Sequence, residues 1–205
     1  PRVLWGAPDG IDLQRHTLVG KSELSKEEEM PGSTPGWMNF AEGWTPKILR
    51  LDGVPHLFRP QQKQVHLIPV GRNRRLGNPI VLDCEHAVSA ASGDVNADGR
   101  DEIMLAVCHD RNATESSWVY WRTNKGFDNQ HRTALPTMSA RDVAVGDLDG
   151  DGCADIVICQ GRTDLLNTTE SLVFRGGAGG VMTSPTCLTT HDATTTLIAQ
   201  TDDSK

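Results

Sequence analysis

Two short acidic segments hold most of the side chains in this chain that could do chemistry. They are "GDVNADGRDEI" (93–103) and "GDLDGDGCADI" (146–156). Carboxylates at alternating positions of a tight loop can bind a hard cation, and a pair of carboxylates can act as general acid and base in glycoside cleavage. A catalytic pair is normally unique, whereas these acids recur at equivalent positions of both segments. We therefore expect cation binding rather than catalysis.

Both segments begin like the calcium loop of an EF-hand but then depart from it. An EF-hand needs a bidentate acid at its twelfth position and helices on either side. Here the twelfth positions are Leu105 and Ile158, and β-rich sequence follows. The ninth positions, Glu102 and Asp155, are acidic instead. The pattern excludes an EF-hand.

The two segments belong to an internal repeat. Residues 91–107 align with 144–160 at an offset of 53, which places Asp94 on Asp147. A further 53 residues lead to 197–205, a decayed copy with Gln200, Asp202 and Ser204 at the corresponding positions. Self-similarity at such a period is typical of repeat folds, including propellers.

Each repeat contains four short runs rich in Val, Ile and aromatic residues and bounded by Gly, Asp or Asn, which predict β-strands. An earlier unit fits the same scheme, with its first two strands in 46–60 joined by the two-residue turn Asp52-Gly53. Its last two strands are predicted at 65–70 and 79–82. In the later units the predicted strands are 87–93, 102–108, 118–121 and 131–135, then 142–146, 155–160, 172–174 and 186–190.

These paired motifs resemble the FG-GAP/VCBS repeats of integrin-α-like β-propellers. The resemblance implies an all-β fold, a β-propeller of four-stranded antiparallel blades, with about 3.5 blades of a seven-bladed ring. We therefore expect a fragment of a longer propeller. The implied organisation is strands C and D of one blade in 1–19, an insertion in 20–45, a blade without a calcium loop in 46–83, calcium blades in 86–136 and 139–190, and the first strand of the next blade in 193–205.

The resemblance also implies two Ca²⁺ sites, one in each acidic loop. Calcium takes six to eight oxygen ligands, and Gly99 and Gly152 permit the sharp turn that such a loop requires. The expected ligands are Asp94, Asn96, Asp98, the carbonyl of Arg100 and Glu102 in the first loop, and Asp147, Asp149, Asp151, the carbonyl of Cys153 and Asp155 in the second. In the third copy, Gln200 and Ser204 replace carboxylates, so we expect no filled site there.

Composition excludes several classes of function. The net charge of −7 argues against nucleic-acid binding, and no apolar run is long enough for membrane insertion. Five cysteines without a C-x-x-C pair argue against a zinc site and leave one or two disulfides open. We expect Trp118, Tyr120 and Trp121 to pack between blades, with Tyr120 on one side and both tryptophans on the other. His86, His109 and His131 are expected to be surface or structural residues.

The function that follows from the resemblance is a non-catalytic recognition or assembly module, extracellular or at the cell surface, and periplasmic in a bacterium. Its partners would be a protein or glycan ligand, as in cell adhesion, and the remaining blades or chains of the same assembly. The binding rim would include the B–C loops, 109–117 and 161–171, and the D–A junctions. Both loops contain N-glycosylation sequons, at Asn112 and Asn167, so the chain would be a glycoprotein in a eukaryotic host. The alternative is the propeller portion of a polysaccharide lyase or hydrolase.

Overall fold

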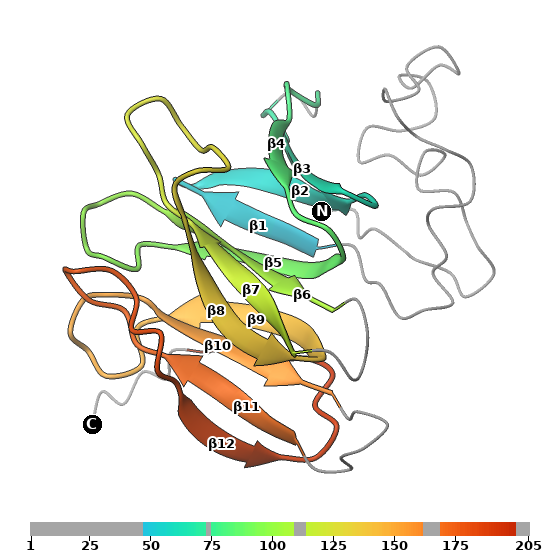
Figure 1. The fold of residues 1–205 in the computed structure, drawn as a ribbon. Coiled ribbons are helices and arrows are strands. Elements are labelled where there is room, and N and C mark those ends of the chain that lie inside the picture. The colour runs from blue at the N-terminus through green and yellow to red at the C-terminus, as the bar shows by residue number, and fades with distance from the viewer. Residues whose placement is uncertain (1–46, 73–74, 109–113, 162–168, 200–205) are drawn as a thin grey trace.

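The chain folds into three four-stranded antiparallel sheets (Figure 1). The computed structural model describes residues 47–72, 75–108, 114–161 and 169–199. Their strands are β1 (Lys47–Leu51), β2 (Val54–Pro60), β3 (Gln64–Pro69), β4 (Ile80–Asp83), β5 (Ala87–Gly93), β6 (Glu102–Val107), β7 (Thr114–Tyr120), β8 (Arg132–Met138), β9 (Ala140–Gly146), β10 (Asp155–Gln160), β11 (Thr169–Phe174) and β12 (Thr186–Thr190). This part of the chain contains no helix, and so none able to cross a membrane. The predicted fold class, all-β with four-stranded antiparallel blades, is confirmed.

Several expectations concern other parts of the chain. The strands expected in 1–19, the insertion at 20–45, His109 and both sequons lie outside the described residues. The same is true of Gln200, Asp202 and Ser204 in the third copy.

Within each sheet the four strands follow one another in chain order, as in a meander. In the first sheet β1 pairs with β2 from Lys47↔Phe58 to Leu51↔Val54. The predicted two-residue turn is present, with φ of 47° at Asp52 and 76° at Gly53, which are the values a type I′ hairpin requires. The equivalent connections of the other two sheets are the acidic loops.

The sheets pack face to face, and the core lies between them. One buried cluster joins the first two sheets and contains Phe58, Leu105 and Tyr120, while a second joins the last two and contains Met104 and Phe174. Successive side chains of β6 alternate between these clusters, so all of β6 is buried. Each fully buried large side chain contributes about 1.5–3 kcal/mol, which makes the two interfaces the main source of stability. The first strands lie side by side, with β1 against β5 and β5 against β9 (Figure 1).

The third strands begin earlier than predicted, and one outer strand ends later. β7 starts at Thr114 rather than 118, β11 starts at Thr169 rather than 172, and β8 continues to Met138 rather than ending at 135. The residues added at the starts of β7 and β11 are polar and lack the apolar alternation from which strands were predicted. Their backbones nevertheless pair with the outer strand, as in Ser117↔Leu135. The expected B–C loops, 109–117 and 161–171, are therefore partly strand.

The prediction for Trp118 and Tyr120 of β7 and for Trp121, which follows it, was wrong in one respect. Trp118 packs against the same cluster as Tyr120, and only Trp121 packs against the other. The strict two-residue period of a strand explains this, because residues two apart share a face.

All five cysteines are free, so the disulfides left open by the sequence do not form. Cys84, Cys153 and Cys159 are buried.

The junctions between sheets share an unusual backbone conformation. His86, Ser139 and Asp192 have φ of 57°, 50° and 50°, and they are spaced 53 residues apart. Each is the left-handed residue that turns the chain after the fourth strand of a sheet. The repeat thus keeps a left-handed conformation at a position where no glycine occurs, although His and Asp adopt it more readily than most other residues.

Candidate metal centre

The two acidic segments form the connections β5–β6 and β9–β10. Gly93 ends β5 and Glu102 begins β6, while Gly146 ends β9 and Asp155 begins β10. Both loops project from the same end of their sheets (Figure 1). Each therefore presents its acids on a hairpin whose stem is anchored in the core.

In the first loop the backbone wraps around the carboxylates. Asp94 accepts hydrogen bonds from the amides of Asp98 (Oδ1, 3.0 Å) and Gly99 (Oδ2, 2.7 Å). The Asp98 amide also donates to Asn96 Oδ1 (3.1 Å), and Asp98 Oδ1 accepts from the Arg100 amide (2.9 Å). These local bonds turn the first, third and fifth side chains toward the inside of the loop, as Asx turns do.

The second loop repeats this arrangement with one more carboxylate. Asp147 accepts from the amides of Gly150 (2.7 Å) and Gly152 (3.0 Å), and these bonds lower its pKa. Asp151 Oδ1 accepts from the Cys153 amide at 2.8 Å. Carboxylate oxygens of Asp147, Asp149 and Asp151 lie within 4.8 Å of one another, and all three side chains are exposed. One cation could therefore reach all three.

The ninth position of the first loop is a buried acid. Glu102 is 1% exposed, and its Oε2 accepts from the Val95 amide at 3.0 Å. Burial raises the pKa of Glu102 to about 7, and the negative charges of Asp98 and Asp94 contribute in the same direction. This carboxyl group would gain most from a bound cation, which would stabilise its charged form.

The ninth position of the second loop is equally buried but differently paired. Asp155 is 1% exposed. Its Oδ2 accepts from the Leu148 amide (3.0 Å) and from Nη1 of Arg175 (2.6 Å), and its Oδ1 accepts from the Gly176 amide (3.0 Å). The guanidinium of Arg175 also lies 3.2 Å from Asp149 Oδ2. The second loop therefore has a positive charge among its acids.

The comparisons with known proteins agree with this arrangement. The family model described as the FG-GAP-like repeat matches residues 77–158. Residues 77–158 are therefore similar to an FG-GAP-like repeat. The match runs from just before β4 to β10 and includes both acidic loops. None of the curated proteins compared with the sequence matches it significantly.

The donor set of the FG-GAP-like loops fits a hard divalent cation. The side chains at the first, third, fifth and ninth positions all carry oxygen, which suits calcium. At the seventh positions, the backbone amides of Arg100 and Cys153 each donate to the acid two residues earlier. The carbonyl oxygens of these two residues are the ones predicted to bind the cation. In the second loop the sequence predicted three ligands, Asp147, Asp149 and Asp151, whose carboxylates the structure brings together. In the first loop it placed a neutral amide, Asn96, at the third position.

Reasoning from the sequence missed Arg175 and Gly176. Both follow β11, 20 and 21 residues after the Asp155 that they contact. The repeat gave no signal for the arginine, because Ile103 pairs with Tyr120 and Ile156 with Phe174, which places Trp121 at the position equivalent to Arg175. Arg122 is the equivalent of Gly176: its amide donates to Glu102, while its guanidinium forms an ion pair with Asp52 of the first sheet.

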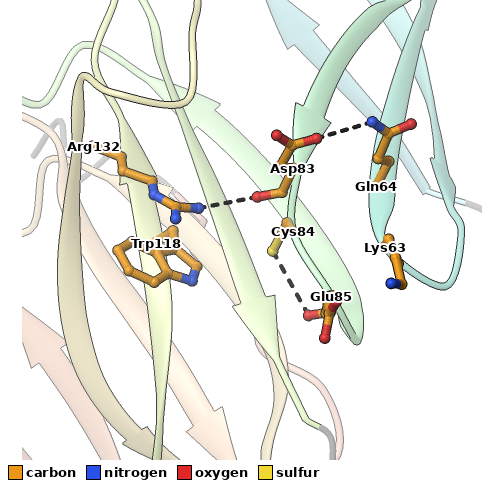
Figure 2. Close-up of a pocket in the computed structure, with 7 residues that line it drawn as sticks. All are labelled: Lys63, Gln64, Asp83, Cys84, Glu85, Trp118 and Arg132. Carbon is orange, nitrogen blue, oxygen red and sulfur yellow. Dashed lines mark hydrogen bonds between the residues drawn. The ribbon is translucent and has the colours of Figure 1, made fainter.

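A hollow of about 480 Å³ lies between the first and second sheets (Figure 2). Its lining consists of Lys63, Gln64, Asp83, Cys84, Glu85, Trp118 and Arg132. The guanidinium of Arg132 lies 3.9 Å from the centre of the Trp118 ring and donates to the Asp83 carbonyl at 3.0 Å. Burial raises the pKa of the Cys84 thiol to about 12, so it carries no reactive thiolate at neutral pH. The polar groups here join the two sheets.

Proposed function

We propose that the protein is a calcium-stabilised β-propeller module of the integrin-like type, which serves extracellular recognition or assembly and performs no catalysis. The remaining blades of the ring would come from the rest of a longer chain or from other chains of the same assembly. The ligand would be a protein or a glycan.

The observation that supports calcium is the convergence of Asp147, Asp149 and Asp151, with oxygens within 4.8 Å of one another. Like charges this close repel one another unless a cation or protons offset them. A cation that binds only the folded loop stabilises the fold by about 2.7 kcal/mol when its concentration is a hundred times its Kd. Calcium in these loops would therefore rigidify the hairpins between the first two strands of each blade.

The test is the thermal stability of the full chain with calcium and with a chelator. We expect Tm to rise on calcium addition and to respond much less to magnesium, which requires a smaller octahedral site. The variant carrying both Asp98→Asn and Asp151→Asn removes one carboxylate from each loop and should lose most of the calcium response. A Tm that is the same in calcium and chelator would contradict the proposal.

The recognition role rests on the resemblance to integrin-like propellers and on the general use of scaffold loops for binding. We place the ligand on the rim opposite the acidic loops, where the junctions at His86, Ser139 and Asp192 lie. Binding of the calcium-loaded protein to arrayed glycans and to cell surfaces, lost in chelator, is the expected result. Cleavage of uronic-acid polymers by the protein would instead favour the polysaccharide-active alternative.

A further inference from the structure

Arg175 lies directly after β11 and reaches into the second acidic loop. Its Nη1 is 2.6 Å from Asp155 Oδ2 and 3.2 Å from Asp149 Oδ2. The Asp155 side chain is 2% exposed, whereas the Arg175 side chain is 37% exposed. The arginine thus enters from the solvent side and caps a carboxylate that is buried in the hairpin stem.

The two carboxylates that Arg175 contacts are the third and ninth positions of the proposed calcium loop. A calcium ion in the loop would need oxygens of these same residues. Two cations cannot share carboxylates at this distance without strong mutual repulsion, and the repulsion is weakly screened where a partner is buried. Calcium must therefore either displace the guanidinium or bind despite the electrostatic repulsion between the two cations.

The first loop shows a different arrangement of the equivalent residues. The residue equivalent to Arg175 is Trp121. The next residue, Arg122, forms an ion pair with Asp52, and its guanidinium lies 5.5 Å from the centre of the Phe127 ring. The buried Glu102 accepts the amides of Val95 and Arg122. Among the described contacts no guanidinium reaches Glu102, so the arginine contact distinguishes the second loop from the first.

We propose that Arg175 is the built-in counter-ion of the second loop. In the absence of calcium its guanidinium offsets part of the negative charge of Asp149 and Asp155 and holds the two side chains together. When calcium is present it competes for the same oxygens and so lowers the affinity of this loop. The inference rests on the calcium binding proposed above and adds how one of the two sites is regulated.

The test compares the calcium affinity of the second loop with and without the positive charge. Asp94→Asn and Asp98→Asn in the full chain remove charge from the first loop, so that titration calorimetry with CaCl₂ reports the second. In this background we expect Arg175→Gln to tighten calcium binding about tenfold and Arg175→Lys to keep the weaker affinity. The matched control is Arg122→Gln, which should leave the second-loop affinity unchanged.

A second measurement addresses the calcium-free state. In chelator, Arg175→Gln should lower Tm, because Asp149 and Asp155 lose their counter-ion, and calcium should restore more stability to this variant than to the parent protein. If the parent binds calcium and Arg175→Gln leaves its affinity unchanged, the counter-ion role is overturned while the calcium site stands. If no variant takes up calcium but Arg175→Gln still lowers Tm in chelator, calcium binding and competition are overturned and only the neutralising role survives.

Discussion

Among single residues, the two buried acids at the ninth loop positions differ most in their surroundings. Asp155 accepts two amides and a guanidinium, whereas Glu102 accepts the amides of Val95 and Arg122 and has two acidic neighbours in place of the guanidinium. A buried carboxylate without a cation is costly, and proton uptake is the simplest way to reduce that cost. The difference should appear in the pH dependence of stability.

We expect Glu102 to make the metal-free protein more stable in mild acid than at neutral pH. Its pKa is raised from 4.5 to about 7, so between these values the folded state binds a proton that the unfolded state has lost. The contribution of this group is fully present below pH 4.5 and is lost as pH rises to 7, with a total of about 3 kcal/mol. Urea unfolding of the metal-free protein across this range measures it.

Glu102→Gln should flatten that pH dependence, because the amide cannot ionise, and should raise stability at neutral pH in the absence of metal. The control is Glu85→Gln. Glu85 is exposed, so this variant should keep the pH dependence of the free energy of unfolding that the parent protein shows. A slope in Glu102→Gln equal to that of the parent protein would rule out Glu102 as its source.

The loop acids could be predicted from the sequence because all of them lie within nine consecutive residues, where alternation and two glycines define the geometry. The contacts of Arg175 and Gly176 could not, because they depend on how the turn after β11 folds back over β10. No local pattern encodes that approach.

At the scale of elements, apolar runs in the sequence predicted where most strands lie. The predictions failed for segments that have no apolar pattern and are strands only because their backbones pair. The polar starts of β7 and β11 pair through their backbones. Ser117 also uses its hydroxyl, which donates or accepts at Thr137 Oγ1 (3.0 Å) and accepts the Val107 amide (3.2 Å). Such segments have the composition of loops and the hydrogen bonds of strands.

The turn after β11 links the two acidic loops. The Gly176 amide donates to Asp155, and the Gly177 amide donates to the carbonyl of Val95 in the first loop at 2.9 Å. A Cβ at Gly176 would lie closer than 3.0 Å to the carbonyl oxygens of Ala154 and Val95. The backbone of this turn therefore fits tightly between the loops.

Gly176→Ala should destabilise the protein by about 2–3 kcal/mol, because backbone atoms rather than flexible side chains would have to move. It should also weaken calcium binding in both loops. The matched control is Gly179→Ala in the same turn, where a Cβ meets nothing within 4 Å and little change is expected. Equal unfolding midpoints for the two variants in urea would contradict this view of the turn.

Arg132 fastens the second sheet to the first across the hollow of Figure 2. It donates to the Asp83 carbonyl (3.0 Å) and to Tyr120 Oη (2.9 Å), and it stacks on Trp118. Arg132→Lys keeps the charge but loses the planar fork, so we expect a loss of about 1–2 kcal/mol in chemical denaturation. The control is Arg100→Lys on the exposed loop. Similar losses from the two substitutions would show that geometry at Arg132 is unimportant.

Over the whole molecule, one polar cluster connects all three sheets along their first strands. Lys47 of β1, Ser89 of β5 and Asp142 of β9 meet there, with Lys47 Nζ and Ser89 Oγ each 2.5 Å from Asp142 Oδ1. Thr195, 53 residues after Asp142, donates to Oδ2 at 2.9 Å. Equivalent positions of successive repeats thus contact one another directly. The sequence did not indicate this, because four different residue types occupy the position.

This cluster should make unfolding of the three sheets a single event, and removing its centre should cost more than any one bond. Burial by itself raises the pKa of Asp142, but hydrogen bonds from Lys47 and Ser89 outweigh it and lower the pKa below 3.8. Its contribution is therefore present above that pH and is lost as pH falls through the lowered value.

Asp142→Asn should lower stability at neutral pH by about 2–3 kcal/mol, because it leaves the Lys47 ammonium poorly paired. A double-mutant cycle with Lys47→Gln in urea should give a coupling of about 1–2 kcal/mol, while Lys125→Gln on the exposed surface should show none. Additive losses for Lys47 and Asp142 would mean that the three sheets are held together by their apolar faces alone.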